Sequence, residues 1–274
     1  RRPAGGRIKV VPKARALARK LGIDLAGVTA SGADGTITVA DVEAAAASAG
    51  PVAKVRERRP LRGIARTMAD NVARSWREVP QFVQQITVDA TDLLRRREAA
   101  ASTGNRVSLT DLLVAAVAGA AIEVPEANAT FAGEEIILYA DVNVSVAVAT
   151  DRGLVVPVVR EAQALRPAEI GARIRELAAQ AKAGTLTGDD LSGGTITVSN
   201  LGMAGVETGF PLVNAPQAVI VFAGAVVERP AVVDGQIVVQ PQLGLGIGYD
   251  HRVLDGATAA RFTAALRTAI EGRA

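Results

Sequence analysis

The chain of 274 residues contains a single histidine, His251. It lies in the segment DHRVLDG (250–256), between a glycine-rich apolar run and the last helical pattern. An imidazole, with a pKa of about 6.5, is the side chain best matched to proton transfer near neutral pH. Any general base of the usual kind must therefore be His251, although an isolated histidine is more often a surface residue. Asp255, four residues later and just before Gly256, is placed to hold an arginine or the loop itself.

A second candidate group is the hydroxyl of Ser199, where the strand pattern TITVS (195–199) runs into a turn at Gly202. Serine and asparagine commonly cap such turns, and Ser199 and Asn200 fit that role. A hydroxyl at the end of a strand can equally donate a hydrogen bond to a developing oxyanion. The pattern by itself leaves both roles open.

Three glycines, Gly244, Gly246 and Gly248, alternate along a strand pattern. The spacing is G-x-G-x-G and no helix start follows, so it does not fit a dinucleotide-binding loop. On a strand, this spacing leaves one face bare and places apolar side chains on the other. The bare face predicts the close approach of another backbone or of a narrow ligand.

The composition excludes several kinds of site. The chain has no cysteine, which rules out a disulfide scaffold, a thiolate metal site and a cysteine nucleophile. With one histidine, a zinc site would depend mostly on carboxylates, so we expect no metal. The longest apolar run, residues 112–122, is well short of the roughly 20 residues that a membrane span needs. The numbering begins at Arg1 without a signal-peptide pattern, and we expect a piece of a longer cytoplasmic chain.

Basic residues gather near the N-terminus. Residues 1–20 hold eight basic and no acidic side chains, and residues 54–77 hold eight basic and two acidic ones. Residues 78–274 hold 15 basic and 22 acidic residues, so the net charge of +3 combines an acidic body with two basic segments. Such segments indicate an acidic protein partner or a phosphate-bearing ligand, or else form an ordinary solvated face. Nucleic acid is disfavoured because no aromatic residues interleave with the early charges to stack on bases.

The elements that must position these groups fall into two units. Residues 8–47 predict a compact pair of helices, with Pro12 and Gly22 typical of the start and stop of the first. Residues 48–60 have linker composition, and residues 61–274 alternate helical and strand patterns, which predicts one α/β domain. Within that domain we expect helices at 61–78, 89–101, 109–122, 167–183 and 256–271, and strands at 81–88, 142–149, 154–159, 194–199, 218–224 and 236–249.

Taken together, the motifs resemble the dihydrolipoamide acyltransferase family, the core components of 2-oxoacid dehydrogenase complexes. YDHRVLDG (249–256) looks like the family's H-x-x-x-D-G signature, which chloramphenicol acetyltransferases and peptide-synthetase condensation domains share. TVSNLGMAG (197–205), FPLVNAPQAVI (210–220) and VNVSVAVATDRGLVVPVV (142–159) resemble its catalytic domain in order and separation. Residues 8–47 resemble its peripheral subunit-binding domain. The resemblance implies a chloramphenicol acetyltransferase-like α/β catalytic domain, a mixed sheet with helices, behind a small two-helix subunit-binding domain.

This resemblance implies acyl transfer from S-acyl-dihydrolipoamide to coenzyme A, with acetyl favoured, as in pyruvate dehydrogenase complexes. The lipoyl group would be carried by an upstream domain that these residues do not include. Because the thiolate is the nucleophile, a base must remove the coenzyme A thiol proton, and we expect His251 to do so. Ser199 is expected to donate to the oxyanion, and Asp255 to orient the loop. In the family the site forms between neighbouring copies of a homotrimer, with the histidine and the serine from different chains.

The resemblance also indicates protein partners, namely the 2-oxoacid dehydrogenase (decarboxylating) component and dihydrolipoamide dehydrogenase. In the family's subunit-binding domain, one arginine of the first helix and a second one after the glycine loop contact these enzymes. Arg15 matches the first position and Arg19 lies nearby, whereas the second position is the uncharged Thr36. Arg62 and Arg66, at the start of the catalytic domain, are candidates for contact with coenzyme A phosphates or are ordinary solvated residues.

Other functions stay open. A non-catalytic scaffold of the same complex keeps the fold but loses the histidine, and the presence of all three site residues argues against it. A free-standing acetyltransferase for a small hydroxyl acceptor has no need of a docking unit. Succinyl or branched-chain acyl groups are alternatives to acetyl, and Met203, Val206 and Phe210 are expected to set the size of the acyl pocket. The last residues, 270–274, form no apolar tail, so we expect isolated trimers rather than a larger core.

Overall fold

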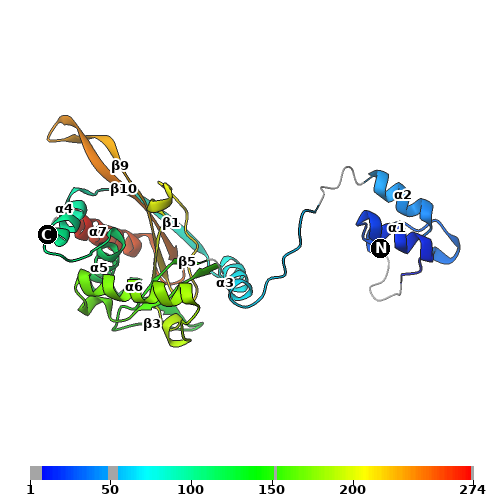
Figure 1. The fold of residues 1–274 in the computed structure, drawn as a ribbon, viewed down its shortest axis with the longest axis horizontal. Coiled ribbons are helices and arrows are strands. Elements are labelled where there is room, and N and C mark those ends of the chain that lie inside the picture. The colour runs from blue at the N-terminus through cyan, green and yellow to red at the C-terminus, as the bar shows by residue number, and fades with distance from the viewer. Residues whose placement is uncertain (1–7, 49–54, 151–152, 273–274) are drawn as a thin grey trace. The chain divides into compact units, whose positions relative to one another are not determined.

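The computed structural model describes residues 8–48, 55–150 and 153–272. The chain divides into two compact units, Arg1–Pro60 and Leu61–Ala274 (Figure 1). Part of the first basic segment (residues 1–7), part of the predicted linker (49–54) and the last two residues (273–274) lie outside the described residues.

The first unit is built on two helices, as the sequence predicts. It consists of α1 (Pro12–Leu21), the 3₁₀ turns η1 (Leu25–Gly27) and η2 (Ala33–Gly35), and α2 (Val39–Ser48). Pro12 opens α1, and Gly22 ends it in the left-handed conformation at φ 71°. Thr38 and Asp41 form a capping box at the start of α2: the backbone N–H of each residue donates to the side chain of the other, at 2.8 and 3.3 Å.

The second unit is organised around a six-stranded mixed sheet. The strand order is β1 (Gln81–Asp89), β10 (Gln236–Asp250), β9 (Val219–Val233), β8 (Ile196–Asn200), β4 (Val144–Val146), β7 (Val158–Val159). The pairs β4–β8 and β8–β9 are parallel, and the other neighbours are antiparallel. Two small antiparallel pairs lie outside this sheet, β2 (Ala129–Phe131) with β3 (Ile136–Leu138) and β5 (Val148–Thr150) with β6 (Gly153–Val155).

Four helices cover one face of the sheet, where the main core lies. They are α4 (Thr91–Ser102), α5 (Leu109–Glu123), α6 (Pro167–Ala183) and α7 (Gly256–Glu271) (Figure 1). Nine residues of α5 are buried, and α5 contacts both α6 and α7, so it is the central helix of this layer. Its start is fixed by a capping box between Ser108 and Asp111, whose carboxylate is buried.

One helix, α3 (Ile64–Glu78), lies on the opposite face of the sheet. The hydroxyl of its residue Ser75 donates to the carbonyl of Val213, and Val79 just after it packs against Val213 and Ile220. Ile220 pairs with Thr197 in the sheet and shares its face. This second face carries the cavity described below.

The predicted helices of this unit are confirmed, but two predicted strands are divided. The alternating pattern at 142–149 becomes β4, in the main sheet, and β5, which pairs with β6 outside it. The run at 154–159 is likewise divided into β6 and β7 around Pro157, which has no N–H for a ladder bond and whose carbonyl accepts from Val146. Alternation marks extended backbone, but it does not indicate which neighbour the backbone joins.

Both β9 and β10 run for 15 residues; β9 is much longer than the predicted 218–224, whereas β10 matches the predicted 236–249 to within one residue. They form a hairpin that projects from its unit (Figure 1). The turn residues Asp234 and Gly235 both have positive φ, 49° and 78°, as a tight hairpin turn requires. Beyond the covered part of the sheet, Val232 and Ile237 stay largely exposed, so this extension was not visible as a buried-strand pattern.

The face of β10 without side chains is covered by backbone. A Cβ on Gly244 would lie 2.6 Å from the carbonyl oxygen of Glu207, and one on Gly246 would collide with the carbonyl oxygen of Gly209. Of the two predicted neighbours, a second backbone or a narrow ligand, the structure shows a backbone. The glycines let the segment 207–211 lie directly on the sheet, and this segment leads into one wall of the cavity.

Candidate active site

A cavity of about 690 Å³ lies on the sheet face that α3 covers. Its lining includes residues of α3 and β8, Thr130 of β2, Ser145 of β4, and the segments 154–156, 191–194 and 212–217. Both Ser199 and Thr197 point into it, because residues two apart on a strand share a face. The sequence motifs at 142–159, 197–205 and 210–220 thus contribute residues to one cavity, although they are distant along the chain.

The hydroxyls of Thr197 and Ser199 differ in their hydrogen bonding. Thr197 is buried; it donates to Gln217 at 2.5 Å and accepts from the side-chain amide of Asn214 at 3.3 Å. Gln217 in turn donates to the hydroxyl of Ser145 at 2.9 Å. Ser199 is half-buried, and its hydroxyl has no hydrogen-bond partner among residues 8–48, 55–150 and 153–272. The turn is capped by Asn200 alone, which accepts from the N–H of Gly202 at 2.9 Å.

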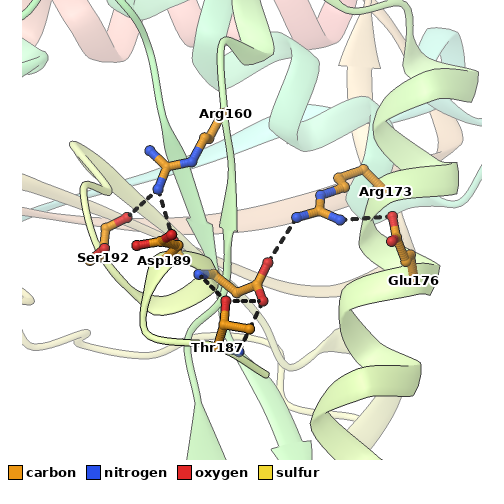
Figure 2. A network of polar contacts seen from close by, with 7 residues as sticks. Arg160, Arg173, Glu176, Thr187, Asp189 and Ser192 are labelled. Carbon is orange, nitrogen blue, oxygen red and sulfur yellow. Dashed lines mark hydrogen bonds and ion pairs between the residues drawn. The ribbon is translucent and has the colours of Figure 1, made fainter. Parts of the chain in front are cut away.

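One wall of the cavity is held by two arginines outside it. Arg160 donates to the carbonyls of Asp189 and Ser192, at 2.8 and 3.3 Å, and Arg173 of α6 pairs with Asp190 at 2.9 Å (Figure 2). Hydrogen bonds from Thr187 lower the pKa of the Asp190 carboxyl, and Arg173 adds to the effect. The segment around η5 (Asp189–Leu191) is therefore fixed before it reaches the cavity at Leu191.

His251 follows directly after β10. Its backbone N–H donates to the carbonyl of Pro80 at 2.9 Å, and its ring lies against Phe82, with the ring centroids 4.6 Å apart. Phe82 stacks in turn on Tyr249, which contacts Phe262 of α7 edge-on. The histidine is exposed, and within the described residues its imidazole makes no hydrogen bond. It is therefore supported by ring packing and is available to a ligand.

Two carboxylates, Asp250 and Asp255, lie near His251, and it is not Asp255 that holds the loop arginine. Within the described residues, Asp255 pairs with no arginine; it caps α7 by accepting from the N–H of Thr258 at 2.8 Å, and this bond lowers the pKa of its carboxyl. The arginine of the loop, Arg252, is held by Asp250 instead, with its closest nitrogen 2.6 Å from the carboxylate. Asp250 is buried, and sequence reasoning missed it because a strand-end aspartate resembles an ordinary turn residue.

Within one copy of the chain, Ser199 and His251 do not meet. Ser199 pairs with Phe222, which pairs with Gly246, so the serine lies two strands away and level with a residue five positions before the histidine. At about 4.8 Å between strands and 3.3 Å per residue, their Cα atoms are roughly 19 Å apart. The two side chains also lie toward opposite faces of the sheet. Gly246 shares the face of Ser199, whereas the aromatic stack that supports His251 lies on the face that α7 covers.

The remaining predicted contact residues are exposed. Arg66 pairs with Asp70 at 2.7 Å on the surface of α3, and neither it nor Arg62 lines the cavity. Arg15 and Arg19 lie on the outer side of α1, and the half-buried Thr36 follows η2.

The residues expected to set the size of the acyl pocket do not line the cavity of a single chain, so their role stays a prediction. Met203 and Phe210 are 97% and 75% exposed, and neither they nor Val206 line the cavity. Met203 belongs to the turn η6 (Gly202–Ala204), which carries it away from β8.

The described residues contain neither a group that could bind a metal ion nor a helix that could span a membrane. Among residues 8–48, 55–150 and 153–272, no group of histidine and carboxylate side chains could hold a metal ion. No helix of the same residues is long and apolar enough to cross a membrane.

Fold and site together define a mixed α/β acyltransferase domain preceded by a small helical binding domain. Two family models match these parts: the catalytic domain of the 2-oxoacid dehydrogenases acyltransferase over residues 53–274, and the E3 binding domain over residues 8–43. The chain belongs to the 2-oxoacid dehydrogenase acyltransferase family, which confirms the resemblance seen in the motifs.

Acyltransferase components of two different dehydrogenase complexes are similar to this chain. The dihydrolipoyllysine-residue acetyltransferase component of the pyruvate dehydrogenase complex of Zymomonas mobilis is 31% identical over 97% of this chain and 65% of its own length. The lipoamide acyltransferase component of the branched-chain alpha-keto acid dehydrogenase complex of Pseudomonas aeruginosa is 36% identical over 99% of this chain and 68% of its own length. The chain thus spans about two thirds of the length of these relatives.

A solved structure supports the fold. The dihydrolipoamide acetyltransferase of Azotobacter vinelandii aligns with a TM-score of 0.74 at 32% identity, covering 81% of this chain and 96% of that one. In that enzyme a serine, a histidine and an asparagine have been investigated for their roles in the catalytic mechanism. The predicted α/β catalytic fold is confirmed.

Proposed function

We propose that this chain transfers an acyl group from S-acyl-dihydrolipoamide to coenzyme A, at a site assembled from two copies of the chain. His251 of one copy would act as the general base, and Ser199 of the neighbouring copy would stabilise the oxyanion. The observation that carries this proposal is that a cavity hydroxyl and an exposed imidazole, neither hydrogen-bonded within the described residues, lie two strands apart in one chain, a separation of roughly 19 Å by ideal strand geometry. Each group is available for chemistry, and only a second copy can bring the two together.

The spacing of these residues supports their assignment. In the Azotobacter vinelandii enzyme the investigated histidine follows the serine by 52 positions, and the asparagine follows the histidine by four. The same intervals separate Ser199, His251 and Asp255. The third residue is the one departure, since an aspartate stands where that enzyme has an asparagine. Both side chains can cap a helix N-terminus, the role in which Asp255 is found.

The reaction then follows from thiol chemistry. His251 takes the proton of the coenzyme A thiol, and the thiolate sulfur attacks the acyl carbonyl carbon, forming a carbon–sulfur bond. The carbonyl oxygen becomes an oxyanion, which accepts a hydrogen bond from the Ser199 hydroxyl. Collapse of this intermediate breaks the bond to the dihydrolipoamide sulfur, and the imidazolium returns its proton to that sulfur. Both thiols belong to the substrates, so a chain without cysteine can perform the exchange.

For the assembly we propose a homotrimer, in which each interface contributes one histidine and one serine. Residues 8–47 would act as a subunit-binding domain, residues 48–60 as a linker and residues 61–274 as the catalytic domain. The partners would be a 2-oxoacid dehydrogenase component and dihydrolipoamide dehydrogenase, approached through Arg15 and Arg19. We expect Arg15→Ala to weaken binding of dihydrolipoamide dehydrogenase in a salt-sensitive way, measured by calorimetry at two ionic strengths.

Arg62 and Arg66 are proposed to lie near the coenzyme A phosphates. Both precede or begin α3, the helix that lines the cavity. Arg66 would have to exchange its surface ion pair with Asp70 for the ligand, and such an exposed pair is worth little. Arg62→Ala and Arg66→Ala should raise KM for coenzyme A while leaving KM for the acyl donor unchanged.

The acyl group is proposed to be acetyl, with succinyl and branched-chain groups as the alternatives that the assay must separate. Acetyl-, succinyl- and isobutyryl-dihydrolipoamide would be offered separately with coenzyme A, and His251→Ala would serve as the control. Turnover of one donor that disappears in the variant supports the proposal and identifies the acyl group. No turnover by a folded trimer, with its mass measured by light scattering, would favour the non-catalytic scaffold instead.

A further inference from the structure

The loop around His251 contains a charged pair that the proposed reaction does not use. Asp250 and Arg252 flank the histidine directly, and they bond to each other across it. Asp250 is 1% exposed, which is unusual for a carboxylate and requires a partner. The side chain of Arg252 is 30% exposed.

The pair closes a short turn around the histidine. One carboxylate oxygen of Asp250 accepts from the backbone N–H of Arg252 at 3.0 Å and from its Nε at 2.9 Å; the other accepts from its Nη2 at 2.6 Å. The backbone carbonyl of Asp250 also accepts from the N–H groups of Val253 and Leu254, each at 3.0 Å. With the His251 N–H bonded to Pro80, the backbone of the histidine is fixed on both sides.

The guanidinium of Arg252 connects this turn to the cavity side of the domain. Its Cζ lies 4.3 Å from the ring centroid of Phe131, within the range of a cation–π contact. Phe131 belongs to β2, and the preceding residue of the same strand, Thr130, lines the cavity. Asp250 raises the pKa of Arg252, and Glu78 at the end of α3 adds a smaller electrostatic contribution. The turn is therefore attached to two elements outside its own strand.

We propose that the Asp250–Arg252 ion pair positions His251 for proton transfer, by fixing the backbone that presents the imidazole. This inference rests on the proposed acyl transfer and assigns neither residue a contact with substrate. Both are positioning residues, and His251 remains the group that moves the proton. The ring packing on Phe82 restricts the imidazole, while the ion pair fixes the point from which it extends.

Because Asp250 and Arg252 carry opposite charges, the pair as a whole adds no net charge beside the imidazole. The charged groups around it are Asp250, Arg252, Asp255 at the start of α7 and Glu78 beyond Arg252; the ring of Phe82, on β1, is neutral. Asp250→Asn leaves an unbalanced cation, which disfavours protonation of the imidazole. Arg252→Gln leaves an unbalanced carboxylate, which favours it.

The experiment uses the full chain with isotopically labelled histidine, whose NMR spectrum contains one imidazole because the sequence contains one histidine. We expect the pH midpoint of the histidine signals to move down in Asp250→Asn, up in Arg252→Gln, and back toward the original value in the double variant. In the coenzyme A assay each single variant should lose about 10–100-fold in kcat, with KM for coenzyme A and for the acyl donor little changed, because misplacing a catalytic group by about 1 Å costs up to about 100-fold. Arg252→Lys, which keeps the charge but loses the fork geometry, should retain more activity than Arg252→Gln.

Arg261→Gln is the matched control, since it breaks the exposed 2.9 Å ion pair of Arg261 with Glu126, which does not involve the histidine turn. It should leave both the NMR titration and kcat unchanged. Where Arg252→Gln fails to fold, the charge-balanced double variant still gives both readouts. Shifts of the same sign in the two single variants, or a kcat loss that only follows unfolding, would overturn the proposal. If the chain transfers no acyl group at all, the NMR titration still tests the ion pair independently.

Discussion

The two proposed reactive groups are held in place by different means. Ser199 lies in a strand with parallel neighbours on both sides, so the sheet fixes its backbone, and within the described residues its hydroxyl makes no hydrogen bond. His251 lies beyond the end of its strand, where a turn, an ion pair and one aromatic ring support it. The comparison teaches that the serine depends on the whole sheet, whereas the histidine depends on a few local contacts. Substitutions near the two groups should therefore fail in different ways.

The largest expected effect follows removal of the imidazole. His251→Ala should lower kcat by about 10³-fold or more, because the coenzyme A thiol loses its base. The fold should be intact, since the side chain of His251 is exposed and its ring lies against Phe82 at the surface. Rates of coenzyme A-dependent transfer and the thermal midpoint Tm would be measured together. Activity near the original value would contradict the proposed mechanism.

Mixing two inactive variants sharpens this prediction. In a mixed trimer of His251→Ala and Ser199→Ala chains, one interface joins an intact histidine to an intact serine. Refolding the two variants together should therefore restore activity to roughly a third of the sites in mixed trimers. The separately refolded variants, combined only afterwards, are the control. Absence of recovery in verified mixed trimers would place the two residues in a single chain.

The next prediction distinguishes Ser199 from Thr197, which lies two positions before it on the same face of β8. Ser199→Ala should lower kcat by about 100-fold with little change in stability, because the hydroxyl has no partner to lose in the described structure. Thr197→Val should do the reverse, costing about 1–3 kcal/mol of stability because the oxygen of Gln217 loses its buried donor. Denaturant unfolding and kcat, measured on both variants, test the contrast. Equal loss of stability in the two would show that the Ser199 hydroxyl is also structural.

A smaller effect concerns the aspartate that caps α7. Asp255→Asn keeps a side chain that accepts from the N–H of Thr258, so activity should stay within about threefold. Asp255→Ala removes the cap and should lower both Tm and activity. If Asp255→Asn alone abolished transfer, the carboxylate would have a chemical role beyond capping.

The smallest effect appears only at alkaline pH. Burial raises the pKa of the Tyr249 phenol, whose hydroxyl lies 2.8 Å from that of Thr263. The unfolded chain therefore releases the phenol proton first as the pH rises. The stability from Tyr249 is complete below the ordinary phenol pKa of about 10 and is lost above it.

We expect the Tm of the native chain to fall more steeply above pH 10 than that of Tyr249→Phe. Tyr139→Phe, which changes a residue that is 37% exposed, is the control and should leave the slope unchanged. Parallel slopes for the native chain and Tyr249→Phe would contradict the assigned cause.

Much of the local structure could be predicted because its causes are local. The ends of α1 and α2 follow from Pro12, Gly22 and the pair Thr38 and Asp41, all within a few residues of each other. The residues in the candidate site were also visible, since a single histidine and a strand-end serine stand out in the sequence. The division of 142–149 into two strands could not be predicted, because alternation is the same in either sheet.

The sequence by itself determined which residues can do chemistry and which elements present them. The tertiary structure decided how they are arranged. It showed that Asp250, not Asp255, holds the loop arginine, that backbone covers the glycines of β10, and that Ser199 and His251 lie on opposite faces of one sheet. The physical reason is that caps and periodicities depend on neighbours along the chain, whereas strand order and register depend on pairings between distant segments, which no local pattern specifies.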